Sequence, residues 1–66
     1  MQRAKELADA LNRNLEELGA PSNVRERATI LSKMFDIPKQ LAWSLLEGHL
    51  LPEDSLLQKI AEEFEL

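Results

Sequence analysis

The stretch SKMFDIPKQLAWSLLEG, residues 32–48, decides the fold of this chain. A helical pattern of apolar residues stops at Asp36-Ile37-Pro38 and starts again immediately, and Gly48 then ends the second segment. Two helices joined by so short a break meet at a fixed angle. A fixed angle serves either the packing of the two helices or the presentation of one of them to a partner.

The three residues of the break have the properties that a tight turn between helices needs. Aspartate tolerates the left-handed backbone conformation better than most residues other than glycine. Ile37 supplies an apolar side chain that can fold back onto the core, and Pro38 suits the first position of a helix because its missing amide would be unpaired there. The sequence therefore predicts helices over Val24–Phe35 and 38–47, in the outline of a helix-turn-helix.

Apolar residues recur at helical spacing in four segments, whereas alternating strand patterns are nearly absent. Segment by segment, the apolar positions are Ala4, Leu7, Leu11, Leu15 and Leu18; Val24, Ala28, Leu31, Met34 and Phe35; Ala42, Leu45 and Leu46; and Leu56, Leu57, Ile60, Ala61 and Phe64. Gly19 is expected to end the first helix and Asn23 to cap the second. The predicted fold class is all-α: a compact bundle of four helices, or five if a further turn forms around residues 49–51.

Length and composition limit what the chain can be. It has 66 residues, no cysteine and one histidine, His49. One domain over residues 1–66 is expected, either complete or the N-terminal part of a longer protein. Without cysteine, disulfides and thiolate metal sites are excluded, and one histidine cannot hold a metal ion alone, so neither a metal nor a cofactor is expected. No apolar run is long enough to span a membrane, and a cytoplasmic location is expected.

An enzymatic function is not expected either. The chain offers no cysteine nucleophile and no histidine–carboxylate–serine set, so no catalytic residues and no small-molecule substrate are predicted. The two glycines, Gly19 and Gly48, cannot form a glycine-rich phosphate loop.

The distribution of charge is more informative than the net charge of −4. Residues 25–49 carry four basic side chains against three acidic ones, whereas residues 50–66 carry one basic side chain against five acidic ones. The middle of the chain is thus the only part that is not acidic, although a nucleic-acid-binding protein usually shows a stronger basic footprint.

From Arg27 to Leu66 the chain resembles the Cro/phage-repressor type of helix-turn-helix domain. The family pattern is roughly LAKxxGVSxxxVSxWLxG followed by xxxPxxxxLxxIAxxLxV, and this chain has LSKMFDIPKQLAWSLLEG followed by HLLPEDSLLQKIAEEFEL. The upstream LNRNLEELGAP is similar to the first helix of repressor-like relatives, so the resemblance covers nearly the whole chain. Two departures stand out: Asp36 replaces the usual turn glycine, and Ala28-Thr29 replaces a glutamine that many members use at DNA.

The resemblance implies a lambda-repressor-like domain that binds double-stranded DNA sequence-specifically, in a bacterial or phage-type transcriptional regulator expected to be a repressor. The helix over 38–47 would lie in the major groove, with its N-terminal part at the base edges. Gln40 is expected to pair with adenine, and Lys39 with guanine or a phosphate. Arg27 and the first amides of helix Val24–Phe35 would position the DNA backbone. The predicted DNA-binding residues are Arg27, Lys39, Gln40, Trp43, Ser44 and His49.

The residues leave alternatives open. Lys39 and Gln40 also suit a solvated first turn, and His49 suits a polar loop. Trp43 is open between a groove contact, packing on the preceding helix and a protein interface, and Leu41 between a thymine methyl group and a partner. The alternative function is a protein–protein interaction module on the same fold, with Leu41, Trp43 and Leu50-Leu51 as its docking surface; the overall acidity favours it.

Few positive charges make the affinity of a single domain weak and dependent on salt, so useful DNA binding would require dimerisation. A homodimer is therefore expected. The candidate dimer surfaces are the long first helix and the C-terminal helix with Phe64 and Leu66.

Overall fold

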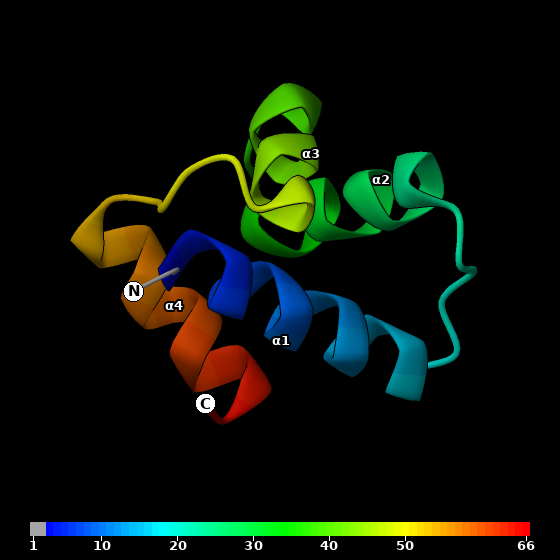
Figure 1. Ribbon diagram of the computed structural model, residues 1–66, viewed down its shortest axis with the longest axis horizontal. Coiled ribbons are helices and arrows are strands. Elements are labelled where there is room, and N and C mark those ends of the chain that lie inside the picture. Colours follow the sequence, from blue (N-terminus) through cyan, green and yellow to red (C-terminus); the bar gives the residue numbers. More distant parts are fainter. Residues whose placement is uncertain (1–2) are drawn as a thin grey trace.

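The computed structural model describes residues 3–66, and within this range the chain forms four α-helices and no strand. Figure 1 shows α1 (Arg3–Glu17), α2 (Val24–Phe35), α3 (Lys39–Glu47) and α4 (Asp54–Phe64). The all-α prediction is confirmed with four helices. Residues 49–51, where a fifth helix had been an open option, form a non-helical connection. Pro52 contributes to this at Leu51, because the residue before a proline is disfavoured in the helical conformation.

Local signals set the ends of α1 and α2. Gly19 has φ 89° and follows α1, as predicted for a glycine at a helix C-terminus. The side-chain oxygen of Asn23 accepts hydrogen bonds from the amides of Arg25 and Glu26 at 2.7 and 3.2 Å, which confirms Asn23 as the cap of α2.

The start of α3 differs from its prediction by one residue. Pro38 has φ −60° and ψ 145°, an extended conformation, and its carbonyl accepts the first hydrogen bond of the helix from Ala42 at 3.1 Å. Pro38 is therefore the residue that precedes α3, and the helix begins at Lys39. The preference of proline for the start of a helix holds, but its own ψ places it outside the helix.

The core consists of residues that all four helices contribute. It contains Leu7, Leu11, Leu15, Ala28, Leu31, Ala42, Leu45, Leu46, Leu56, Ile60 and Phe64. Two residues of the predicted apolar stripes are exposed: Leu18 is 68% exposed and Met34 is 37% exposed. Leu18 follows the last residue of α1, so the helical spacing no longer fixes the direction of its side chain.

The helices pack so that α3 contacts both α1 and α2, while α4 packs against α2. In Figure 1, α2 and α3 occupy the upper half of the view and α1 and α4 the lower half. At the contact between α2 and α4, the rings of Phe35 and Phe64 meet edge to face with centroids 5.8 Å apart. At the contact between α1 and α3, a Cβ atom on Gly48 would lie 3.3 Å from the Cα atom of Lys5, so the end of α3 packs directly against the backbone of α1. Within residues 3–66, no helix is long and apolar enough to cross a membrane.

Candidate nucleic-acid interface

The turn between α2 and α3 determines how α3 is presented. Asp36 adopts the left-handed conformation with φ 55° and ψ 52°, as the sequence predicts. The backbone amides of Asp36 and Ile37 both donate to the carbonyl of Ser32, the latter at 3.0 Å. The side chain of Ile37 packs against the core. The turn is therefore fixed by backbone bonds on one side and by apolar packing on the other.

Packing of α3 leaves one long face of this helix exposed. Ala42, Leu45 and Leu46 are buried, as predicted. On the opposite side, four of the predicted DNA-binding residues come together around a shallow hollow, here called the Trp43 hollow: Lys39, Gln40, Trp43 and Ser44. Its walls are mostly apolar, and Trp43 itself is 36% exposed. The structure thus places the exposed Lys39 and Gln40 and the half-buried Ser44 beside an aromatic surface.

Arg27 is a different case, because its side chain is buried with only 7% of the residue exposed. Its Nε donates to the carbonyl of Pro21 at 2.6 Å and its Nη1 to the side-chain oxygen of Asn12 at 2.8 Å. Its Nη2 lies 3.8 Å from a carboxylate oxygen of the exposed Glu16. Since these donors are engaged inside the fold, we assign Arg27 a structural role and leave it out of the proposed DNA contacts.

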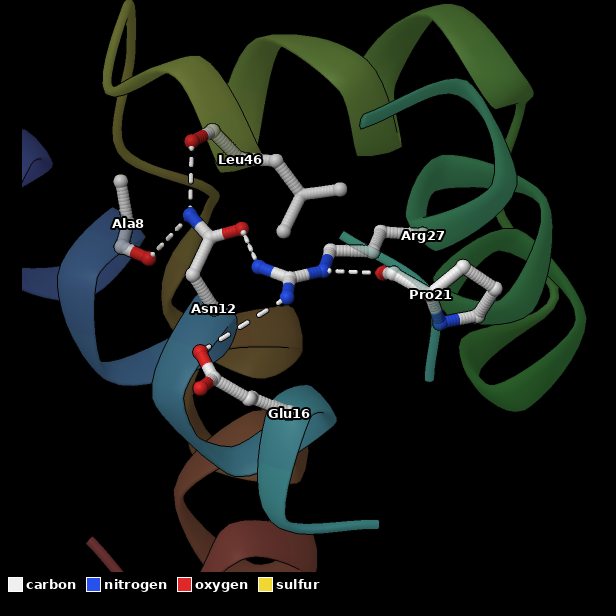
Figure 2. A network of polar contacts seen from close by, with 6 residues as sticks. All are labelled: Ala8, Asn12, Glu16, Pro21, Arg27 and Leu46. Atoms are coloured by element: carbon white, nitrogen blue, oxygen red, sulfur yellow. Dashed lines mark hydrogen bonds and ion pairs between the residues drawn. The ribbon is translucent and has the colours of Figure 1, made fainter. Parts of the chain in front are cut away.

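Asn12, which the sequence analysis did not single out, is the centre of this network (Figure 2). Its side-chain amide donates to the carbonyls of Ala8 and Leu46 at 2.8 and 3.1 Å. The Leu46 carbonyl belongs to the last turn of α3, where carbonyls have no partner within their own helix. Asn12 and Arg27 together therefore join α1, the loop before α2, α2 itself and the end of α3.

His49 does not join the Trp43 hollow. It is exposed, it follows Gly48 at the end of α3, and its amide donates to the carbonyl of Ser44 at 3.0 Å. A nine-residue helix is about 14 Å long, so His49 and Lys39 lie at opposite ends of α3. A contact from His49 to DNA would therefore be separate from any contact made by the residues of the Trp43 hollow.

The N-terminus of α2 is less available for DNA than the sequence analysis expected. The amides of Arg25 and Glu26 are occupied by the Asn23 side chain, so these two amides are not free to bind a phosphate. The side chain of Arg25 remains exposed in the first turn of α2. Arg25, rather than Arg27, is thus the arginine of this helix that can reach a phosphate.

Glu47 shares the exposed face of α3, and the sequence analysis did not single it out. It is exposed and lies seven residues after Gln40, which places both side chains on the same face of α3. The seven-residue spacing would have been sufficient to find it. Its carboxylate puts a negative charge on a face proposed to meet a polyanion.

The surface named for the alternative function is divided by the structure into two. Leu41, Leu50 and Leu51 line a groove of about 420 Å³, the leucine groove, whose other apolar walls include Phe35, Ile37 and Leu56. Trp43 lines the separate Trp43 hollow. Residues two positions apart on a helix point about 200° from each other, which explains why Leu41 and Trp43 do not share a face.

Comparisons with known proteins do not assign the chain to a family. A scan of protein-family models found no match to the chain, and searches of curated proteins and of solved structures found none either.

Proposed function

We propose that the chain binds double-stranded DNA sequence-specifically, as the helix-turn-helix domain of a bacterial or phage-type transcriptional regulator with repressor activity. One observation carries the proposal: a tight turn holds α3 with exposed Lys39, Gln40 and Trp43 and half-buried Ser44 together on the side away from the core. A major groove is wide enough to admit such a helix. The resemblance of residues 27–66 to the Cro/phage-repressor domain supports the same placement.

In this proposal Lys39, Gln40 and Ser44 of α3 contact the DNA directly. Gln40 donates to and accepts from the N7 and N6 edge of an adenine, and Lys39 binds guanine or a phosphate. Ser44 is a short donor and acceptor further along the helix. Arg25 contacts a phosphate from the first turn of α2, and His49 another from the far end of α3. Two copies of the chain bind the two halves of a palindromic site.

The test is an amide chemical-shift titration of the labelled chain with mixed-sequence duplex DNA at low salt. The proposal expects shifts at Arg25, Lys39, Gln40 and Ser44 that diminish as salt is added. Gln40→Ala should weaken binding by about 5- to 100-fold, the usual discrimination of a bidentate base contact. Gln58→Ala is the matched control, because Gln58 is exposed on α4. A folded, dimeric chain that produced no shifts at low salt would overturn the proposal.

A second candidate function is protein binding through the leucine groove. It is favoured by the exposure of Leu50 and Leu51, 37% and 41%, at a groove that apolar side chains line together with Asp36, Glu53, Ser55 and Lys59. Substitutions on the two surfaces distinguish DNA binding from protein binding. Lys39→Ala and Gln40→Ala lower the affinity for DNA and leave protein binding unchanged, whereas Leu51→Gln has the reverse effect.

A further inference from the structure

We infer that the Trp43 hollow receives the C5-methyl group of a thymine, so that Trp43 makes the chain selective for an A·T pair. The inference rests on the proposed DNA-binding function and names the base that the exposed face of α3 recognises. Trp43 is accordingly a specificity-determining residue rather than a general contact.

The position of the hollow on α3 suits this role. Its four residues form two i, i+4 pairs on adjacent rows of the helix, Lys39 with Trp43 and Gln40 with Ser44. Any ligand in the hollow is therefore within reach of the Gln40 amide as well as of the indole ring. A base pair whose adenine binds Gln40 brings a thymine to the same face of the helix.

The exposure of Trp43 also suits a base-edge contact. At 36% exposed, most of the side chain is covered by the protein, which restricts its rotamers. The exposed remainder contributes to mostly apolar walls, while the polar groups of the hollow come from Lys39, Gln40 and Ser44. Such a surface favours an apolar group that is surrounded by hydrogen-bonding atoms.

Among the base edges in the major groove, one presents such a group. Guanine, cytosine and adenine display hydrogen-bond donors and acceptors, whereas thymine displays an acceptor and the C5-methyl group. Burial of one methyl group against an apolar surface changes an affinity by about fourfold.

Leu41, the other apolar residue near the start of α3, does not compete for this role. It packs partly against the core and lines the leucine groove together with Leu50 and Leu51. Its direction from the helix axis differs by about 200° from that of Trp43. If Trp43 faces the base edges, Leu41 faces away from them.

The experiment compares two duplexes that differ in methyl groups alone. One is an A·T-containing mixed-sequence duplex, and the other has deoxyuridine in place of every thymine, which keeps all phosphates and hydrogen-bonding atoms. Dissociation constants are measured at low salt by fluorescence anisotropy. The indole Nε1–H resonance of Trp43 is followed in parallel, since Trp43 is the only tryptophan of the chain. We expect the dissociation constant for the deoxyuridine duplex to be higher by about fourfold or more. The deoxyuridine duplex should also shift the indole resonance less than the thymine duplex does.

Two variants show whether Trp43 causes the difference. Trp43→Ala should weaken binding to the thymine duplex and reduce the ratio of the two dissociation constants to about one. Leu51→Ala removes an exposed apolar side chain on the other flank and should leave the ratio unchanged. The amide spectrum of each variant establishes that it is folded. Comparing ratios between variants also removes any effect of uracil on the shape of the duplex, because that effect is common to all of them.

The outcomes distinguish this inference from the function on which it rests. Equal affinity of the native chain for both duplexes overturns the thymine contact and leaves DNA binding intact. A preference for thymine that survives in Trp43→Ala assigns the methyl group to another residue and also overturns the inference. Absence of binding to either duplex overturns the proposed function and the inference together.

Discussion

At the scale of single residues, the half-buried Asn12 and the buried Arg27 form a polar network. The side-chain oxygen and nitrogen of Asn12 make three hydrogen bonds, to Ala8, Leu46 and Arg27. Arg27 adds a bond to the carbonyl of Pro21. A network of this kind stabilises a fold because each buried polar group would be costly to leave without a partner.

We therefore expect Arg27→Ala to lower the free energy of unfolding by about 2–3 kcal/mol, since it leaves the Asn12 oxygen and the Pro21 carbonyl without their donor. That is a large share of the total for a chain of this length, which is of order 3–10 kcal/mol. Urea denaturation followed by circular dichroism measures it. Arg25→Ala is the matched control, because Arg25 is exposed on the same helix and should change stability by less than about 0.5 kcal/mol. Equal effects of the two variants would contradict the structural role of Arg27.

Two features of Asp36 lower the stability of the fold. Its left-handed conformation, φ 55°, costs a non-glycine residue about 1–2 kcal/mol, and its carboxylate lies at the negative end of α2. Asp36→Gly should raise the free energy of unfolding by about 0.5–1 kcal/mol, after the entropy cost of glycine is subtracted. The urea midpoint at constant slope is the measurement.

Asp36→Asn separates the two causes, because asparagine removes the charge and keeps a side chain that tolerates the left-handed region. We expect it to gain only a few tenths of a kcal/mol, the helix-end contribution. A loss of stability in Asp36→Gly would show that the carboxylate of Asp36 contributes more than its backbone strain costs.

At the scale of an element, α3 is buried on one face by Ala42, Leu45 and Leu46 and exposes the opposite face. The Trp43 hollow lies near its first turn and Glu47 near its last. The exposed face is thus favourable to DNA at one end and unfavourable at the other.

Glu47→Gln should consequently strengthen binding to duplex DNA, by about two- to fivefold at low salt, because it removes a repulsion between the carboxylate and the phosphates. Anisotropy titrations measure the change. Glu62→Gln alters the net charge equally on the exposed side of α4 and should have less than a twofold effect. If Glu47→Gln weakened binding, Glu47 would instead be an acceptor for a cytosine amino group.

At the scale of the whole molecule, the negative net charge limits the affinity for DNA in the proposed complex. The chain carries a net charge of −4, and the exposed cations placed to meet phosphates in the proposed complex include Arg25 and Lys39. DNA binding by such a molecule depends on a few ion contacts in each copy.

We expect the logarithm of the association constant to fall with the logarithm of salt concentration with a slope of about −2 for one copy, and about −4 for a dimer with two ion contacts in each copy. Binding isotherms between 50 and 200 mM salt give the slope, and analytical ultracentrifugation gives the number of copies. A slope near zero would contradict phosphate contacts from these residues.

The elements followed from the sequence because their signals are local. Asn23 caps α2, Asp36 adopts the left-handed conformation and Gly48 ends α3, each through bonds to residues at most a few positions away. The boundary at Pro38 was misplaced by one residue, since the preference of proline for helix starts does not distinguish the first helical residue from the one before it.

The roles of individual side chains depended on tertiary structure. Asn12 bonds to Arg27 fifteen positions away and to Leu46 thirty-four positions away, so only the packed helices show that Arg27 is occupied. Burial is equally non-local: Met34 matches the apolar period, yet it is 37% exposed. The sequence alone determined the four helical segments and the turn that orients α3 and left a fifth turn around residues 49–51 open, because backbone preferences act over a few residues. Which side chains remain free for a partner was decided by the fold, because a side chain's neighbours come from distant parts of the chain.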